Sequence, residues 1–186
     1  MALRKYPTIG CCGIDCGLCP RFYTVGASRC PGCCGEGFEE VHPPCGFITC
    51  CMKKHGLNVC AECVDFPCKR FEKETGERDS FVLHRKVMPN QHLIAEIGIG
   101  EFVKRQQERI SFLETALAHY DDGRSKSLFC IAATLLSAES LKQSLSLAEN
   151  GAPLKTILNR FCRRRRASVE VKEVIQPKKP TALWAL

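Results

Sequence analysis

The sequence predicts an α+β or irregular fold class, in which a small metal-stabilised, cysteine-rich module with short helices precedes an α-helical part. Thirteen of the fifteen cysteines lie before residue 69, and thiols so close in sequence are typical of metal sites. After about residue 90 apolar residues instead recur with a helical period. We therefore expect a cysteine-rich metal-binding module over 1–78, a helical domain over 79–162 and a basic flexible tail over 163–186.

The cysteine-rich module offers little material for an apolar core. Large aliphatic side chains are few for its length, and a small fold with too little core usually depends on additional cross-links such as disulfides or metal ions. Metal binding would supply such cross-links, because the free energy of ligation contributes to the free energy of folding. Glycine and proline favour tight turns that aim backbone amides at sulfur. Short helical turns are expected over 21–25, 47–54 and 66–75.

Three helices packed antiparallel are expected in the helical domain. Apolar residues over 99–120 recur near the helical period, which predicts a helix of about twenty residues. A second helix is expected over 128–148, closed by Asn150-Gly151. Pro153 suits the first turn of a third helix. The tail that follows is polar, and we expect it to be mobile until a partner holds it.

Ten cysteines are candidate metal ligands because they fall into groups with ligand spacing. Two thiolates separated by two residues can reach one ion, and Cys30-Pro31-Gly32-Cys33 and Cys60-Ala61-Glu62-Cys63 both have this form. The ten candidates are Cys12, Cys16, Cys19, Cys30, Cys33, Cys45, Cys50, Cys60, Cys63 and Cys68. They exceed what two four-thiolate sites require, and their pairing cannot be deduced from sequence.

Five further cysteines are interpreted differently. Cys11, Cys34 and Cys51 each stand directly beside a candidate ligand, and neighbouring side chains of an extended segment rarely reach one tetrahedral ion. They are expected to be buried or reactive thiols. Cys130 and Cys162 fall on apolar helical faces, where a plain core role is expected.

The metal is left open between zinc, at about two sites, and [4Fe-4S] clusters. Zinc usually takes its ligands as two separated pairs, which Cys30/Cys33 and Cys60/Cys63 provide. Iron-sulfur clusters often take three cysteines from one tight run, which Cys12-Cys16-Cys19 provides. We favour zinc because charged residues surround the last group over 62–70, whereas redox clusters commonly lie under an apolar cover.

Composition excludes several classes of protein. The formal net charge of +7 falls to about +3 if two four-thiolate sites each carry about −2, so charge alone does not indicate a phosphate partner. No segment resembles a signal peptide or a membrane helix, so we expect a cytoplasmic protein without membrane contact, in which disulfides are rare. The chain is too short for the barrel of radical S-adenosylmethionine enzymes, whose cluster loop the spacing of Cys12, Cys16 and Cys19 matches.

No catalytic residue is predicted. Nothing resembles a phosphate-binding glycine loop or a nucleophile with its base. His42 and His55 could substitute as ligands, although an exposed position is expected for each. Asp121, Asp122 and Arg124 are interpreted as a polar turn. Whether the protein is an enzyme stays open, and binding is favoured over catalysis.

Three motifs occur in order, namely Cys12-Gly13-Ile14-Asp15-Cys16-Gly17-Leu18-Cys19-Pro20, Arg29-Cys30-Pro31-Gly32-Cys33 and Cys60-Ala61-Glu62-Cys63-Val64-Asp65-Phe66-Pro67-Cys68. Together they resemble a cysteine-rich prokaryotic family catalogued as domain of unknown function 3795, over about the first 75 residues. The stretch from Tyr120 to Lys126 is similar to a segment that follows this domain in longer members. The resemblance implies a metal-binding protein, frequent in anaerobes, with no assigned reaction.

Four functions are compatible with these patterns. The first is a cytosolic metal-binding interaction module whose helical part and tail dock a protein partner. The second is an iron-sulfur protein that passes electrons to a partner enzyme. The third is a regulator that binds nucleic acid through Arg163, Arg164, Arg165 and Arg166, although cations at a helix end are also favoured by the helix dipole and by solvation. The fourth is a thiol-rich metal carrier or sensor.

Overall fold

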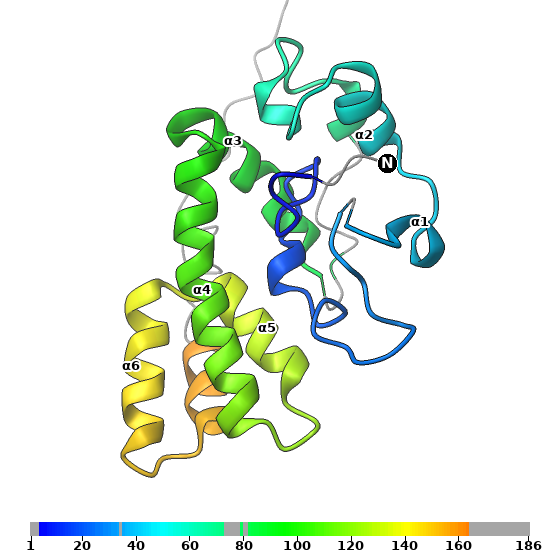
Figure 1. Ribbon diagram of the computed structural model, residues 1–186. Coiled ribbons are helices and arrows are strands. Elements are labelled where there is room, and N and C mark those ends of the chain that lie inside the picture. The colour runs from blue at the N-terminus through cyan, green and yellow to red at the C-terminus, as the bar shows by residue number, and fades with distance from the viewer. Residues whose placement is uncertain (1–3, 34, 73–78, 80–81, 164–186) are drawn as a thin grey trace, which may run out of the picture.

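The computed structural model describes residues 4–33, 35–72, 79 and 82–163. All regular structure in these residues is helical, and no strand occurs among them (Figure 1). The prediction of an α+β fold is therefore wrong. The physical reason is that short-range hydrogen bonds, such as Cys19 N to Cys16 O at 3.1 Å and Cys63 N to Cys60 O at 3.0 Å, close the cysteine motifs into single turns. No alternating run is left that is long enough to pair as a strand.

Short helical elements make up the cysteine-rich part. They are η1 (Cys16–Leu18), α1 (Phe38–Val41), α2 (Gly46–Ile48), η2 (Thr49–Lys54), η3 (Cys60–Glu62), η4 (Lys69–Phe71) and η5 (His84–Lys86). The helical turn expected over 47–54 is confirmed by α2 and η2. The segment 21–25 forms turns and no helix. Of the turn expected over 66–75, the structure describes residues 66–72, and η4 is the helical element among them.

The longer helices are α3 (Val87–Ile97), α4 (Ile99–Tyr120), α5 (Lys126–Leu135) and α6 (Ala138–Glu149), followed by a helix over 154–163. The helix expected over 99–120 is confirmed by α4. The single helix expected over 128–148 is wrong, because Leu136 is extended and Ser137 caps α6 by accepting the Ser140 N–H at 3.2 Å. Serine competes for the backbone in this way at helix starts, so the chain breaks into two helices there.

Helices α5 and α6 and the helix over 154–163 gather around the C-terminal half of α4 (Figure 1). Their core contains Ile110, Leu113, Phe129 and Leu158, and Leu18 of η1 is inserted into it with 3% of its surface exposed. The cysteine-rich part therefore packs directly against the helices. The predicted boundaries of the three parts stay predictions, and of the expected basic tail only Arg163 is a described residue.

A second apolar cluster joins the cysteine-rich part to α3 and α4. Ile9 and Val59, both fully buried, pack with Ile94 of α3 and Phe102 of α4. Gly98, with φ of +79°, makes the sharp corner between the two helices, a conformation that favours glycine. Among the described residues, no helix combines the length and the apolar character that crossing a membrane requires.

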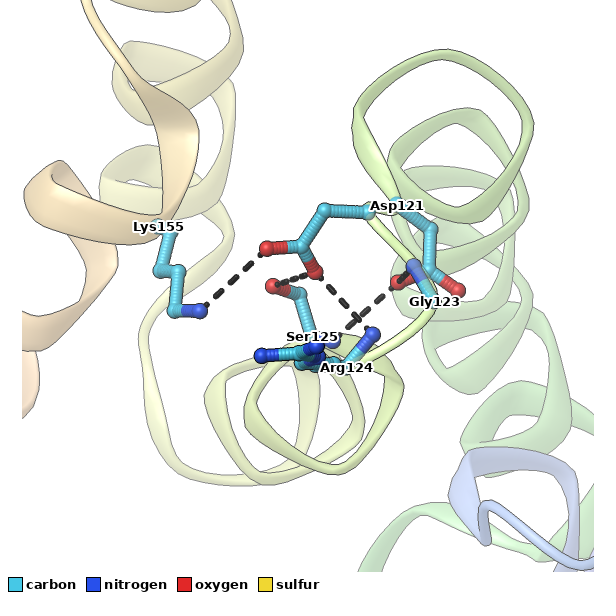
Figure 2. A network of polar contacts seen from close by, with 6 residues as sticks. Asp121, Gly123, Arg124, Ser125 and Lys155 are labelled. Carbon is cyan, nitrogen blue, oxygen red and sulfur yellow. Dashed lines mark hydrogen bonds and ion pairs between the residues drawn. The ribbon is translucent and has the colours of Figure 1, made fainter.

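The loop between α4 and α5 is the expected polar turn (Figure 2). Asp121 accepts the N–H groups of Gly123 and Ser125, each at 3.1 Å. Asp122 accepts the Ser125 hydroxyl at 2.7 Å and the Arg124 N–H at 3.0 Å. Lys155 donates to the other carboxylate oxygen of Asp122 at 3.3 Å, which ties the loop to the helix over 154–163. The turn orients α5 and needs no ligand to explain it.

The Asp122 carboxylate should make the stability of this turn depend on pH. The Ser125 hydroxyl, the Arg124 N–H and Lys155 lower its pKa from 3.8 to about 2. Because the folded pKa is the lower one, the stabilisation is complete above the ordinary pKa and is lost as pH falls towards 2. Asp122→Asn should therefore lower the thermal midpoint at neutral pH, and the difference from the wild type should shrink in acid.

The control for this prediction is Glu108→Gln, which removes one exposed charge from α4 outside the turn. It should leave the thermal midpoint almost unchanged at both pH values. A deficit of Asp122→Asn that is equally large at about pH 2 and pH 7 would contradict the account, since most of the stabilisation that comes from the lowered pKa is lost at the lower pH.

Candidate metal centre

All ten candidate ligands lie in the described residues, and each is buried or half-buried. They gather in two places. The first thiol group consists of Cys12, Cys16, Cys19, Cys30, Cys33 and Cys45. The second thiol group consists of Cys50, Cys60, Cys63 and Cys68, which line one cavity.

Members of the first thiol group are close enough to influence one another electrostatically. Burial raises the pKa of Cys16 most, and negative charge on three other members of the group raises it further. Burial is also the largest cause that raises the pKa of Cys12, followed by negative charge on other members of the group. Several of these thiols can lose their protons together only if positive charge takes the protons' place. A bound metal cation would supply that charge.

Backbone amides point at four sulfurs of the first thiol group. Cys12 accepts an N–H bond from Ile14, Cys16 from Cys33, Cys19 from Arg21 and Phe22, and Cys33 from Cys11. Each of these contacts acts to lower the pKa of the thiol that it reaches, because an N–H donor stabilises the thiolate more than the thiol. This geometry suits anionic sulfur, the form that binds metal.

The turn around Cys12 is shaped by a glycine that lies against α3. The Gly10 N–H donates to the Ile14 carbonyl at 2.8 Å and closes the turn. Gly13 has φ of +94°, and a Cβ there would lie 2.8 Å from both the Gln91 side chain and the Val87 carbonyl. Only glycine fits this close approach, so the turn docks directly on the helix.

The second thiol group shares its cavity with apolar side chains. Leu57, Phe66 and Phe71 line it together with the four cysteines, and Arg70 also contributes to its wall. Glu62 is engaged elsewhere in the turn, where its carboxylate accepts the N–H groups of Asn58 at 2.8 Å and of Val59 at 3.3 Å. The charged residues that favoured zinc in the sequence are therefore only part of the surroundings of this group.

Cys11 and Cys51 connect the two groups. Their thiols form a chain of contacts that runs Cys33, Cys11, Cys51, Cys60. At Cys11 the contact with Cys33 lowers the pKa, but the contact with Cys51 and burial outweigh it and raise the pKa. At Cys51 the contact with Cys11 also lowers the pKa, and the contact with Cys60 and burial raise it to about 12.

These values decide between the two roles expected for the doubled cysteines. Cys11 is 1% exposed and Cys51 is 3% exposed. Of the two roles expected for them, the structure therefore supports that of buried thiols. Cys34 lies outside the described residues.

Arg4 supports the chain of thiols, and the sequence patterns did not single it out. Its guanidinium is 7% exposed and donates to the carbonyls of Ile9 and Asn58, the latter at 2.6 Å. Its positive charge acts to lower the pKa of Cys11 and of Cys51. Next to Lys5 in the sequence it resembles an ordinary solvated charge, and only the fold buries it.

Buried amide side chains of α3 and α4 hold the cysteine turns in place. Asn90 donates to the Gly13 carbonyl at 2.8 Å and to Asp15 at 2.9 Å. Gln106 donates to the Thr8 carbonyl at 3.1 Å and to Asp15 at 2.9 Å. Burial raises the pKa of Asp15, and these two donors act against the rise. In the sequence, the signal that could have identified these residues is the presence of amide side chains on otherwise apolar helix faces.

The remaining candidates lie outside the two groups. His42 is exposed and stacks on Phe38, with ring centroids 4.6 Å apart. His55 is exposed at the edge of the second cavity. Cys130 is 1% exposed, and burial raises its pKa to about 12. Cys162 packs half-buried against the same helical core, so the core role expected for both cysteines is confirmed.

Over residues 4–33, 35–72, 79 and 82–163, no three His, Cys, Asp or Glu side chains already form a group that could hold a metal ion. The assignment of ligands to sites is therefore a proposal. The chemistry of the donors fits soft cations such as zinc and iron, since thiolates are their preferred ligands. The amides directed at sulfur support the same assignment.

Comparison with known proteins found no family model that matches the chain, and no curated protein or solved structure that is similar to it. The resemblance to domain of unknown function 3795 accordingly stays a proposal.

Two glycines with similar backbones test how the first thiol group docks on α3. Gly13→Ala should lower the free energy of unfolding by about 1–3 kcal/mol more than Gly26→Ala does, because the new methyl group is overpacked against Gln91 and Val87. Gly26 has φ of +88° and open space around it, so its substitution carries the backbone strain without the crowding. Urea unfolding of both variants measures the difference. Equal losses would show that the turn does not depend on this contact.

Proposed function

We propose that this protein binds metal through two groups of thiolates in its cysteine-rich part, and that it acts as an interaction module. The observation that carries the proposal is the convergence of ten cysteines into two groups, with backbone N–H donors directed at four of the sulfurs. Zinc at about two sites is the first candidate, because four thiolates in tetrahedral arrangement form its usual structural site.

The bound metal would supply fixed positive charge and a covalent link between distant turns. In the first thiol group, four of the six cysteines Cys12, Cys16, Cys19, Cys30, Cys33 and Cys45 would hold it. In the second, Cys50, Cys60, Cys63 and Cys68 would hold it. The apolar cluster of Ile9, Val59, Ile94 and Phe102 then carries the geometry of the turns to α3 and α4.

An iron-sulfur protein that transfers electrons to a partner is the second candidate. It is favoured by the apolar wall that Leu57, Phe66 and Phe71 contribute around the second thiol group, because exclusion of water is one of the means by which proteins adjust cluster potentials. In that case Cys50, Cys60, Cys63 and Cys68 would hold a [4Fe-4S] cluster. Three of these cysteines lie close together in sequence and the fourth lies further away, a spacing that is common for such clusters.

The partner is proposed to be a protein, in the cytoplasm. Nucleic acid is the alternative partner, through Arg163, Arg164, Arg165 and Arg166, of which only Arg163 is a described residue. The carrier or sensor function expected from the doubled cysteines receives less support, because Cys11 and Cys51 are buried between the two groups and metal exchange needs accessible sulfur.

Metal analysis and a visible spectrum of the full chain, purified without oxygen, test the proposal. About two zinc ions per chain are expected if zinc is the metal, and a brown sample rich in iron and sulfide if clusters are bound. Cys16→Ser should remove the metal of the first thiol group and Cys63→Ser that of the second. Cys162→Ser, which changes a thiol outside both groups, should remove none.

Because metal stabilises the folded chain, a strong chelator should lower the thermal midpoint of the wild type. Metal content that is unchanged in both Cys16→Ser and Cys63→Ser would contradict the assignment of ligands. A folded preparation that contains neither zinc nor iron would contradict the proposal as a whole.

A further inference from the structure

Gln91 of α3 touches the main chain of both cysteine turns. Its side chain is fully buried, with 0% of its surface exposed. Its Nε2 donates to the carbonyl of Cys11, which directly precedes Cys12 of the first thiol group, at 2.8 Å. Its Oε1 accepts the N–H of Ala61, which lies between Cys60 and Cys63 of the second thiol group, at 2.6 Å. One amide therefore spans the two groups.

The same carbonyl of Cys11 also accepts the N–H of Cys60 at 2.9 Å. Cys11, Cys60 and Gln91 thus form a three-way junction at which the two turns meet on the helix. Displacing either turn would leave a polar atom of Gln91 buried without a hydrogen bond, which is unfavourable. Each turn is therefore held more firmly when the other is in place.

A turn that is already ordered binds metal more tightly, because less conformational entropy is lost when its thiolates close around the ion. We propose that Gln91 is a positioning residue that couples the two thiol groups, so that metal bound at one raises the affinity for metal at the other. This inference rests on the proposed function, since it assumes that both groups bind metal. Coupling of this kind is reciprocal by thermodynamic necessity.

Gln106 provides a matched control. It is also a buried glutamine, with 2% of its surface exposed, and it comes from the neighbouring helix α4. Its side-chain N–H groups contact Thr8 and Asp15, both on the side of the first thiol group. Replacing Gln106 should weaken the first group alone, whereas replacing Gln91 should weaken the connection between the groups.

The test measures zinc binding to the full chain without oxygen, in competition with a chelator of known affinity. Cys63→Ser gives the zinc affinity of the first thiol group alone, and Cys16→Ser that of the second alone. The coupling factor is the overall constant for two zinc ions in the intact chain divided by the product of these two constants. A factor of about ten is expected, the size of one well-placed hydrogen bond.

In the Gln91→Leu background the coupling factor should fall towards one, while Gln106→Leu should keep it near the wild-type value even if the first group binds more weakly. Gln91→Glu, which keeps an acceptor for Ala61 but cannot donate to Cys11 when ionised, should also reduce it and decides the question if Gln91→Leu does not fold. Faster hydrogen exchange of the Ala61 amide in Gln91→Leu is expected as an independent sign of the lost bond.

A wild-type coupling factor of one, or a factor that survives both Gln91 substitutions, would overturn this inference while leaving two metal sites intact. A wild type that binds no zinc or iron would overturn the proposed function, and this inference with it. The two failures are distinguishable because the first leaves the metal content unchanged.

Discussion

The constraint on which the rest of the structure depends is the protonation state of its buried cysteines. Cys11, Cys12, Cys16 and Cys33 all have raised pKa values, through burial and through contact with or negative charge on other cysteines, yet backbone N–H groups are directed at Cys12 and Cys16 as they would be at anions. Neutral thiols make little use of such donors, whereas metal-bound thiolates make full use of them. The proposed metal ligation would reconcile deep burial with the arrangement of the amides.

The helices contribute a polar surface to this part of the molecule as well as an apolar one. Asn90, Gln91 and Gln106 are buried amides that satisfy the carbonyls and the Asp15 carboxylate of the cysteine turns. Leu18 packs into the helical core and so fixes the first turn to it. The turns are therefore held by directional bonds and by packing together, which suits a rigid module whose shape a partner could recognise.

The parts that could be predicted from sequence are those with local causes. Apolar period placed α4, because it depends on residues a few positions apart. Ligand spacing marked the candidate cysteines, but it did not show which of them lie together, since Cys30/Cys33 and Cys60/Cys63 fall in different thiol groups. The break at Leu136 was missed because the apolar period continues across it, whereas the single serine Ser137 caps the start of a new helix. Arg4, Gln91 and the contact between Cys11 and Cys51 could not be predicted, since each acquires its role from residues far away in the chain.

X-ray absorption at the metal edge of anaerobically purified, full-length protein tests the central claim most directly, because it reports which atoms bind the metal without assuming which metal it is. The account predicts a first shell made of sulfur alone, with four sulfur ligands per ion at about 2.3 Å if the metal is zinc. A first shell dominated by oxygen or nitrogen would contradict it, because the buried thiols would then have to be explained without a metal.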